Sequence, residues 1–356
     1  MNEKEIVLSG IRATGNLHLG NYYGALSKFV KMQDAYDCLY FIADLHALTT
    51  APDPKALHEN VRNIVAEYLA AGVDPEKATI FVQSDVPEVS EMYLLLNMHV
   101  GIGELMRTAS FKDKARKQLG ITVNADNADA DIERQIIGTD SNKRVNAGLL
   151  TYPTLMAVDI LIQKAHKVPV GKDQEQHLEL TRRFARRFNS FYNVDLFPEP
   201  ENFNFGGEAV KVPGLDGSGK MGKSEGNCIY LVDDEKVLRK KVMRAVTDEG
   251  PKEPNQPVSA PVENLFTLME LTSAPEVVKQ YRDAYADCSI RYGDLKKQLA
   301  EDILKVTTPI RERYAEIKGD DAYIGSVLRR GAERARERAA KTLAEVRQAM
   351  GIIKFY

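Results

Sequence analysis

The sequence contains no tryptophan, only three cysteines and almost no excess of charge. Cys38, Cys228 and Cys288 lie far apart and are odd in number, so they provide neither a disulfide framework nor a pair of metal ligands. Such cysteine usage favours a reducing compartment, the cytoplasm. The formal net charge of −3 gives the molecule no overall basic character. A nucleic-acid partner would therefore have to be met by a local basic patch.

Long apolar runs are also missing. No run approaches the roughly 20 residues that a membrane-spanning helix needs. The charged N-terminus passes directly into an apolar strand, so we expect no signal peptide. What remains is an ordinary globular composition, with 44% hydrophobic and 28% charged residues among 356. This length accommodates an α/β domain together with a helical one.

Three short apolar segments in the first part of the chain predict strands: Ile6–Leu8, Cys38–Asp44 and Thr79–Gln83. A helical pattern separates the second from the third, running from Pro54 to Ala71 with a proline near its start and Gly72 as a stop. This alternation predicts an α/β fold with a doubly wound parallel sheet. Residues 44–46, Asp-Leu-His, follow the second strand, at the sheet edge where ligands bind in such folds.

Farther along, the pattern predicts helices over 88–106, 151–164 and 173–189. Residues 111–145 hold basic side chains, a run of Asp and Asn, and few large apolar residues, so we expect an inserted, mobile surface excursion there. From residue 233 onward the pattern is wholly helical. This shift predicts two domains, an α/β domain over 1–232 and an all-α domain over 233–356. The pattern also allows the last helix, predicted over 322–350, to pack back on the first domain.

The segment from Ile6 to Leu26, IVLSGIRATGNLHLGNYYGAL, predicts a strand, a glycine-rich turn and the start of a helix. Such a turn presents free backbone N–H groups and the positive end of a helix dipole, which suits a phosphate. His18 can donate to a phosphate oxygen, and Gly20 lets a flat base approach the backbone. The segment lacks both the G-x-G-x-x-G spacing and the P-loop lysine. Taken alone, it is interpreted equally well as a purely structural turn.

A second candidate for phosphate binding is the segment Lys220–Ser224, KMGKS, which follows a loop rich in glycine. Lysines in loops usually serve solubility alone. Here the flanking glycines favour a mobile loop whose two lysines, Lys220 and Lys223, can close on a polyphosphate.

The helix predicted over 151–164 carries a third candidate. Tyr152, Met156 and Asp159 fall at i, i+4 and i+7 and therefore share one face. A carboxylate in an apolar stretch is costly to bury unless it is paired, which favours a ligand-binding role over a place in the core. The next helix carries four arginines within residues 182–187. They form either a solvated face or a contact with a nucleic-acid backbone.

With these motifs the sequence resembles the class I aminoacyl-tRNA synthetases, and within that class the tryptophanyl-tRNA synthetases of the bacterial type. His18–Asn21 and Lys220–Ser224 stand at the two signatures of the class. The stretches TYPTLMAVDIL and VPVGKDQEQHLELTRRFARRFN match as well, and the likeness spans nearly the whole chain. The resemblance implies a Rossmann-like catalytic domain in residues 1–232, a helical tRNA- or anticodon-binding domain in residues 233–356, and a homodimer.

The resemblance also implies a reaction. The carboxylate of L-tryptophan attacks the α-phosphorus of ATP to give tryptophanyl-adenylate and pyrophosphate, and the acyl group then passes to the 3′-terminal ribose of tRNA(Trp). His18, Lys220 and Lys223 would be the catalytic residues. Mg²⁺ would accompany ATP, and no zinc, iron–sulfur cluster or metal held by the protein is expected.

Binding residues follow from the same resemblance, position by position. Asp159 would accept the indole N–H, which is the only donor of that ring. The residues that would bind tryptophan are Gly10, Tyr152, Met156, Asp159 and Gln174. Those that would bind ATP are Arg12, Ala13, Thr14, Gly20, Asn21, Gly171, Lys172, Asp173, Val212, Lys220, Met221, Gly222, Lys223 and Ser224.

The chain departs from the family pattern at a few positions. Arg12 and Ala13 stand where the pattern has Gln and Pro, Lys172 where it has Glu, Leu45 where it has Gln, and Gly222 where it has the central Ser.

The competing interpretations are a tyrosyl-tRNA synthetase, another adenylate-forming enzyme of this superfamily, and a non-catalytic tRNA-binding relative. A tyrosine pocket needs partners for a phenol that both donates and accepts. A pure binding module has no use for a pyrophosphate loop.

Overall fold

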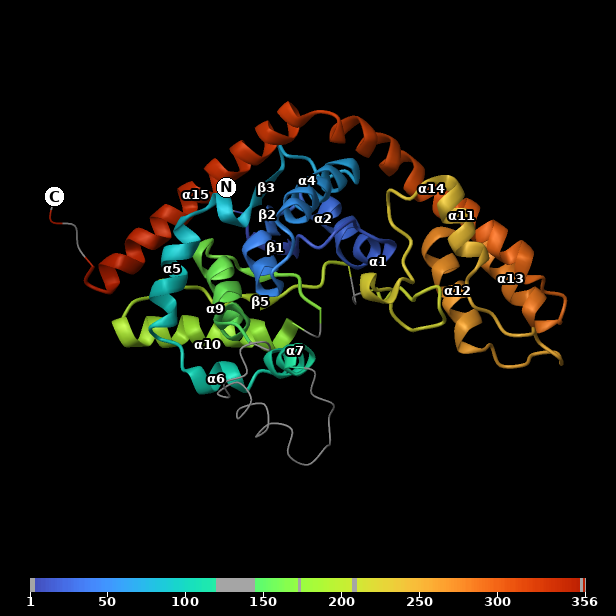
Figure 1. Ribbon diagram of the computed structural model, residues 1–356, viewed down its shortest axis with the longest axis horizontal. Coiled ribbons are helices and arrows are strands. Elements are labelled where there is room, and N and C mark those ends of the chain that lie inside the picture. The colour runs from blue at the N-terminus through green and yellow to red at the C-terminus, as the bar shows by residue number, and fades with distance from the viewer. Residues whose placement is uncertain (1–3, 120–144, 172–173, 207–209, 353–354, 356) are drawn as a thin grey trace.

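The computed structural model describes residues 4–119, 145–171, 174–206, 210–352 and 355, and a five-stranded sheet lies near its centre (Figure 1). All strand pairs are parallel and the order is β3-β2-β1-β4-β5, which confirms the predicted doubly wound sheet. The strands are β1 (Ile6–Arg12), β2 (Asp37–Ala43), β3 (Ala78–Val82), β4 (Lys167–Val168) and β5 (Glu201–Asn202). The order reverses between β1 and β4, where such sheets form a crevice at the carboxyl ends of their strands.

Alternate residues of the central strands enter two hydrophobic layers, because successive side chains of a strand point to opposite faces. Val7 and Tyr40 pack in one layer with α4 (Pro54–Ala70) and α14 (Tyr292–Lys318). Leu8 and Phe41 pack in the other layer with α9 (Ala147–Ile162) and α10 (Glu175–Tyr192). Burial on both faces explains why β2 is a continuous apolar run rather than an alternating one.

Local signals in the sequence account for several helix ends. Asp53 caps α4, its Oδ1 accepting from the N–H of Ala56 at 2.9 Å, and Pro54 is the first helical residue. Asn193, in the left-handed conformation, ends α10. The other α-helices of the described residues are α1 (Leu19–Asn21), α2 (Ser27–Met32), α3 (Asp44–Ala47), α5 (Glu88–Asn97), α6 (Ile102–Met106), α7 (Ala109–Leu119), α11 (Glu235–Met243), α12 (Ala260–Thr272), α13 (Pro275–Ala286) and α15 (Asp321–Ala349).

Between residues 88 and 145, one predicted element is wrong and a second is wrong over its first nine residues. The helix predicted over 88–106 is two helices, α5 and α6, because Gly101 has extended backbone (φ −76°, ψ 129°) and starts a new helix. The excursion predicted over 111–145 begins inside α7. Phe111 and Ala115, one helical turn apart, are buried against Leu149 and Tyr152, which gives this helix an apolar anchor. Residues 120–144 lie outside the described part of the chain.

The helices of the C-terminal region pack in two places, α11 and α12 on α14, and α15 on the α/β part. α14 also contacts α4. α15 turns back and lies along the α/β part, over β3 and α5 (Figure 1). At Gly331 the helix approaches the strand so closely that a Cβ atom would lie 1.7 Å from the carbonyl oxygen of Ile80. Only glycine permits this packing distance.

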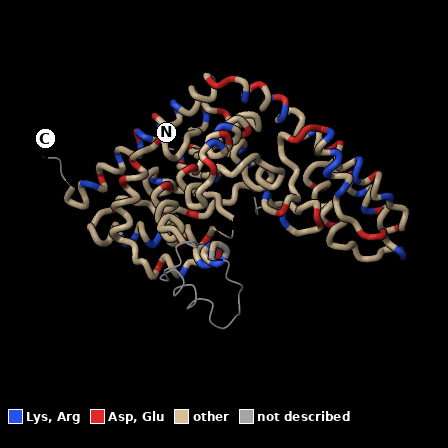
Figure 2. The backbone as a smooth tube through the Cα atoms, in the orientation of Figure 1, with Lys and Arg blue, Asp and Glu red and all other residues tan. Residues whose placement is uncertain are grey.

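Ion pairs line the same contact. Acidic and basic residues alternate along α15 (Figure 2), and four of its arginines reach acids of the α/β part. The pairs are Arg330–Glu76, Arg336–Glu88, Arg338–Asp37 and Arg347–Glu91. Exposed pairs of this kind stabilise by about 0.2–1 kcal/mol each. The close backbone contact between Gly331 and Ile80 therefore matters more for the position of α15 than any single pair.

Candidate active site

A cavity of about 530 Å³ opens at the carboxyl ends of β1 and β4, in the crevice that the strand order predicts. Tyr152, Met156 and Asp159 all line it, so the face predicted for them on α9 is confirmed in space. The structure brings together eight of the residues assigned to tryptophan or ATP: Gly10, Arg12, Asn21, Tyr152, Met156, Asp159, Gly171 and Gln174.

Asp159 is the buried carboxylate of this cavity, with 5% of its surface exposed. Its Oδ2 is 3.0 Å from Nε2 of His46, and Nε2 of Gln83 donates to both carboxylate oxygens at 2.8 and 2.9 Å. Burial raises the pKa of Asp159, and the contacts with His46 and Gln83 oppose that rise. The carboxylate is therefore held in a fixed orientation by side chains that follow β2 and β3.

Tyr152 connects this cavity to α7 and α10. Its hydroxyl is hydrogen-bonded to Oγ of Ser110 and lies 2.8 Å from Nε2 of His177. Oγ of Ser110 is in turn 3.0 Å from the same His177 nitrogen. This network fixes the phenol ring, so that its face borders the cavity while its polar end is satisfied.

Two cationic side chains reach the cavity. The guanidinium of Arg12 donates at 3.4 Å to the carbonyl oxygen of His46 and to Oγ1 of Thr49, and its Nε is buried with no partner among the described residues. Nζ of Lys114 lies 3.9 Å from the centre of the Tyr152 ring. Burial lowers the pKa of both groups, and the charge of Arg12 lowers that of Lys114 further. Neither cation has an acidic partner in the described chain, so the cavity presents unpaired positive charge to an anion.

His18 caps the start of the short helix α1, and its backbone N–H donates to Oδ1 of Asn21 at 3.1 Å. Burial and the charges of Lys223 and Lys220 lower the pKa of His18 to about 4. The imidazole is therefore neutral near pH 7 and offers an N–H donor rather than a charge. A Cβ at Gly20 would lie 2.8 Å from the His18 ring, so glycine is needed for the imidazole to take this position.

The lysine loop, Lys220–Ser224, is held in its conformation by hydrogen bonds of Asn227, a side chain that is 4% exposed. Its Oδ1 accepts from the N–H of Gly222 at 2.9 Å, and its Nδ2 donates at 3.0 Å to Oδ1 of Asp216 and to Oγ of Ser218. Just beyond it, the backbone of 229–231 is hydrogen-bonded to the turn before α1. The loop is thereby fixed beside the glycine-rich turn.

Lys223 connects the two candidate phosphate segments directly. Its Nζ donates to the carbonyl oxygens of Thr14 at 3.1 Å and Gly15 at 2.7 Å. Burial lowers the pKa of Lys223. The turn and the loop, about two hundred residues apart in sequence, therefore meet through this ammonium group.

The other described residues assigned to ATP are absent from the lining of the cavity. Ala13, Val212 and Met221 are buried, and the carbonyl oxygen of Val212 accepts from the N–H of Met221 at 2.8 Å. Lys220 and Ser224 are exposed on the loop. Lys172 and Asp173 lie outside the described residues.

The sequence places His46 at the ligand-binding edge of the sheet, but it assigns no specific role to His46 and none to Gln83, Lys114 or His177. The signal used for His46 also applies to Gln83, which follows directly after the buried strand β3. Polar side chains at that edge converge in open parallel sheets. Lys114 and His177 carried no such signal, because their place depends on how α7 and α10 pack.

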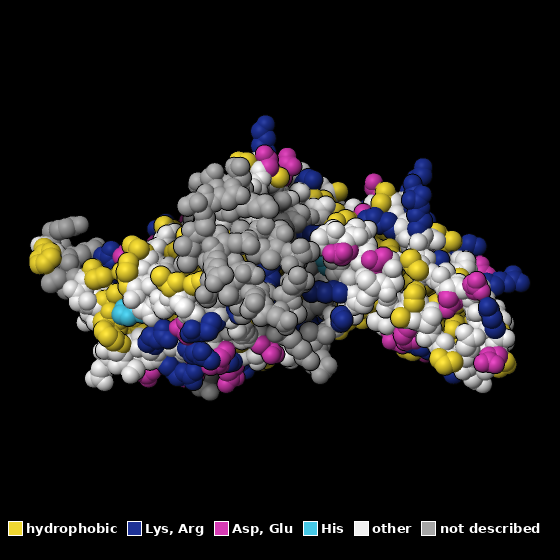
Figure 3. Space-filling model, turned by 60° about the horizontal axis from the view of Figure 1, so that its bottom comes forward, with side chains coloured by type: hydrophobic (Ala, Val, Ile, Leu, Met, Phe, Trp, Pro, Cys, Tyr) yellow, Lys and Arg dark blue, Asp and Glu magenta, His cyan; other side chains and the backbone are white. Residues whose placement is uncertain are grey.

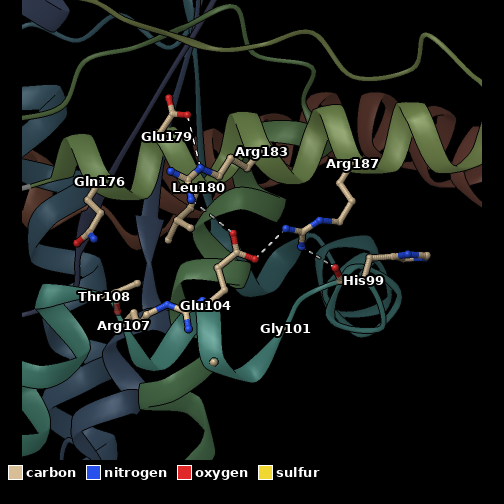
Figure 4. A pocket seen from close by; sticks show the side chains of 11 residues that line it. His99, Gly101, Glu104, Arg107, Thr108, Gln176, Glu179, Leu180, Arg183 and Arg187 are labelled. Carbon is tan, nitrogen blue, oxygen red and sulfur yellow. Dashed lines mark hydrogen bonds and ion pairs between the residues drawn. The ribbon is translucent and has the colours of Figure 1, made fainter. Parts of the chain in front are cut away.

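A second cavity, of about 790 Å³, lies between α6 and α10. Arg183 and Arg187 line it, and Glu104 points between them (Figure 4). Oε2 of Glu104 is 2.9 Å from Nη2 of Arg187, and Oε1 is 3.9 Å from Nη1 of Arg183. Glu179 pairs with the other two arginines of the cluster at 3.1 and 3.2 Å. These pairs favour the interpretation of the cluster as a solvated face over a nucleic-acid contact.

Known proteins resemble this chain over almost its whole length. A family model described as tRNA synthetases class I (W and Y) matches residues 1–307. A tryptophan–tRNA ligase from Porphyromonas gingivalis is 61% identical over 347 residues, which cover 98% of this chain and 99% of that protein. A second one, from Fusobacterium nucleatum, is 40% identical over 347 residues, covering 97% and 98%.

Solved structures give the same result. The tryptophanyl-tRNA synthetase from Campylobacter jejuni, in a complex with ADP and tryptophan, matches with a TM-score of 0.82 at 33% identity. The match covers 97% of this chain and 99% of that one. The corresponding enzyme from Mycoplasma pneumoniae matches with a TM-score of 0.75 at 30% identity and covers 98% of each chain.

Proposed function

The chain belongs to the class I tRNA synthetases of the tryptophan and tyrosine branch, it ligates tryptophan to tRNA, and we propose which of its residues carry the reaction. The Rossmann-like α/β part and the helical C-terminal region are those of this class. The assignment of the site rests on Asp159, a carboxylate that is buried in a cavity and makes three hydrogen bonds with His46 and Gln83.

Asp159 selects the amino acid by accepting the indole N–H. An ionised carboxylate has about four acceptor positions, and His46 and Gln83 take three of them. The remaining position suits an indole, which has one donor. A tyrosine phenol both donates and accepts, and would leave a polar group unpaired here. Gly10, Tyr152, Met156 and Gln174 shape the rest of the pocket.

Activation is mainly a matter of position and charge. The tryptophan carboxylate attacks the α-phosphorus of ATP, and two anions must approach each other. Arg12 and Lys114 supply positive charge at the cavity, which offsets that repulsion. His18, neutral near pH 7, donates a hydrogen bond to a phosphate oxygen. Lys220 and Lys223 neutralise the departing pyrophosphate.

We assign the rest of the nucleotide site to the glycine-rich turn, the Gly171 segment and the lysine loop. Support comes from Lys223, which holds turn and loop together in the structure. The residues are Ala13, Thr14, Gly20, Asn21, Gly171, Lys172, Asp173, Val212, Met221, Gly222 and Ser224.

ATP is the nucleotide substrate, and Mg²⁺ is its proposed companion. The described residues contain no group of three or more His, Cys, Asp or Glu side chains that could hold a metal ion. They therefore do not fit a metal site built by the protein. Mg²⁺ would be carried by the phosphate oxygens of ATP.

We assign activation to residues 1–232 and the anticodon of tRNA(Trp) to the helical domain, residues 233–356. Support for this division is that α11 and α12 pack on α14 away from the sheet. Acylation of the 3′-terminal ribose would follow at the cavity once pyrophosphate has left.

The proposed assembly is a homodimer. Four large hydrophobic side chains on or directly after α5, α6 and α10 are widely exposed. Figure 3 shows hydrophobic side chains gathered at the end of the molecule where α5 and α10 lie. They are Leu94, Met98, Ile102 and Phe191, exposed to 56%, 69%, 66% and 70%. Such patches mark contacts between proteins, and a second copy can cover this one through an isologous interface.

The proposed location is the cytoplasm. No described helix is long and apolar enough to cross a bilayer. The three cysteines are free thiols, which suits a reducing compartment that also holds ATP and tRNA.

One assay tests the proposed function as a whole. Pyrophosphate exchange into ATP, run one amino acid at a time, is expected to depend on tryptophan alone. Exchange that depends on tyrosine would favour the tyrosyl-tRNA synthetase, and the absence of exchange with every amino acid tested would favour a non-catalytic tRNA-binding protein.

A further inference from the structure

Glu67, on α4 beneath the glycine-rich turn, is fully buried, and the reaction described above does not use it. Its Oε2 accepts from the N–H of Leu17 at 2.9 Å, directly before His18. Its Oε1 is buried and has no partner in the described part of the chain. Two turns earlier on the same helix, Nδ2 of Asn60 donates to the carbonyl oxygen of Ala13 at 3.3 Å. α4 therefore holds both ends of the turn.

The charges that face Glu67 come from three elements. Lys223 of the lysine loop and Lys318 at the end of α14 both act on the carboxylate, and Tyr68 of α4 is affected by it. No ion pair joins Glu67 to a cation among the described residues. Burial raises the pKa of Glu67 to about 8, while the N–H of Leu17 and the two lysines oppose that rise. The charge state of Glu67 therefore changes within the range in which such an enzyme is assayed.

We propose that Glu67 is a positioning residue that fixes His18 through the N–H of Leu17 and sets, by its charge, how readily Lys223 leaves the turn for the pyrophosphate. The proposal rests on the role proposed above for Lys223. When Glu67 is protonated, only the neutral carbonyl groups of Thr14 and Gly15 hold the ammonium. They release it readily, because phosphate oxygens make stronger, charge-assisted hydrogen bonds.

Ionised Glu67 has the opposite effect. A negative charge beneath the turn attracts the ammonium of Lys223 and repels the pyrophosphate oxygens, and in a buried site such interactions are weakly screened. Raising the pH through the Glu67 transition therefore slows activation without changing the tryptophan pocket, which lies at β1 and α9.

The variant Glu67→Gln retains an oxygen acceptor for Leu17 and removes the charge. Pyrophosphate exchange with tryptophan is measured from pH 6.5 to 9.5 in the full-length enzyme. The wild-type kcat is expected to fall about fivefold above pH 8, while that of Glu67→Gln stays level. The tryptophan KM is expected to stay the same in both.

Asn60→Ala serves as the matched control, because it removes the other anchor of the turn and carries no charge. It is expected to keep the alkaline fall of the wild type. If Glu67→Gln shows a fall of the same size and midpoint as the wild type, the proposal is overturned, since another group, such as Lys223 itself, would then titrate.

Thermal unfolding tests the buried carboxylate without turnover. The pKa of Glu67 rises from its ordinary value of 4.5 to about 8 on folding. The stability that the bound proton gives the folded chain is therefore complete below pH 4.5 and is lost progressively as the pH rises to 8. The Tm of Glu67→Gln minus that of the wild type is expected to grow between pH 5 and 8. A difference that does not change with pH overturns the proposal. Wild-type enzyme without exchange at any pH would refute the proposed function instead, and leave this measurement valid.

Discussion

At the scale of single residues, Asp159 illustrates how burial and hydrogen bonding compete at one carboxylate. Burial in the cavity wall favours the protonated form, whereas His46 and Gln83 favour the ionised form, and burial has the larger effect on the pKa. The contacts still determine the orientation of the group, because a buried carboxylate without them would cost several kcal/mol. The orientation makes Asp159 suited to read one donor of a ligand.

Asp159→Asn is expected to raise the tryptophan KM about 100-fold and to leave the ATP KM within about twofold, since about 2–3 kcal/mol is lost at the indole alone. Steady-state pyrophosphate exchange, with each substrate varied in turn, measures both values. Thr154→Val is the control, because Thr154 is equally buried on α9 and lies outside the cavity. Equal increases for tryptophan and ATP would mean that Asp159 is structural.

Lys223→Ala is expected to lower kcat of exchange about 10²- to 10³-fold and to leave the dissociation constant of tryptophan unchanged, because its charge acts on the leaving group. Kinetics give the first value and calorimetric titration the second. Lys236→Ala, on the exposed face of α11, should change neither. An unchanged kcat in Lys223→Ala would remove the lysine loop from the mechanism.

At the scale of elements, two segments support the site: α4, which is hydrogen-bonded to the glycine-rich turn, and the lysine loop, whose conformation Asn227 stabilises. Glu67 of α4 and Asn227 of the loop do not line the cavity themselves, but the segments that they hold fix the backbone of Leu17, which does. A third element, α15, covers β3 on the outer side of the sheet. Its position depends on one glycine rather than on its many exposed ion pairs, since those pairs stabilise weakly.

Gly331→Ala is expected to destabilise the protein by about 2–4 kcal/mol, because the new Cβ would lie 1.7 Å from the Ile80 carbonyl oxygen and force α15 away from β3. Urea unfolding followed by circular dichroism measures the change. Gly325→Ala is the matched control on the same helix, where nothing lies within 4 Å of the new atom. Its expected effect is a gain of about 0.5–1 kcal/mol from helix propensity. Equal effects of the two variants would contradict the proposed packing.

At the scale of the whole molecule, the chain joins a parallel sheet, a helical region and a final helix that returns to the sheet (Figure 1). Four of its large exposed hydrophobic side chains lie on or directly after α5, α6 and α10, at the end of the sheet part: Leu94, Met98, Ile102 and Phe191. The distribution of charge is mixed along the surface helices. The apolar patch is therefore the surface on which the proposed dimer depends.

Met98→Asp is expected to shift the enzyme from dimer to monomer at micromolar concentration, because a charge at the centre of an apolar interface must be buried without a partner. Analytical ultracentrifugation measures the mass in solution. Val237→Asp places the same charge on α11, at a side chain that is 42% exposed, and should leave the mass unchanged. A wild type that sediments as a monomer would refute the assembly.

The sequence by itself determined the parts that depend on local pattern. Burial of β1, β2 and β3 on both faces leaves apolar runs, and the face of α9 with Tyr152, Met156 and Asp159 follows from helical periodicity. The two signature segments could be identified because the chemistry of a phosphate site requires particular residues at short spacing.

The tertiary structure alone decided which distant side chains meet. His46 and Gln83 reach Asp159 only because the register of β2 and β3 places their ends beside α9. Glu67 would pass for one more exposed helical acid until α4 lies under the turn, and Lys114 for part of a loop until α7 packs on Tyr152. Periodicity reports that a residue is buried, whereas its neighbours are fixed by strand register and helix packing. These arise from contacts far apart in sequence, so no local pattern records them.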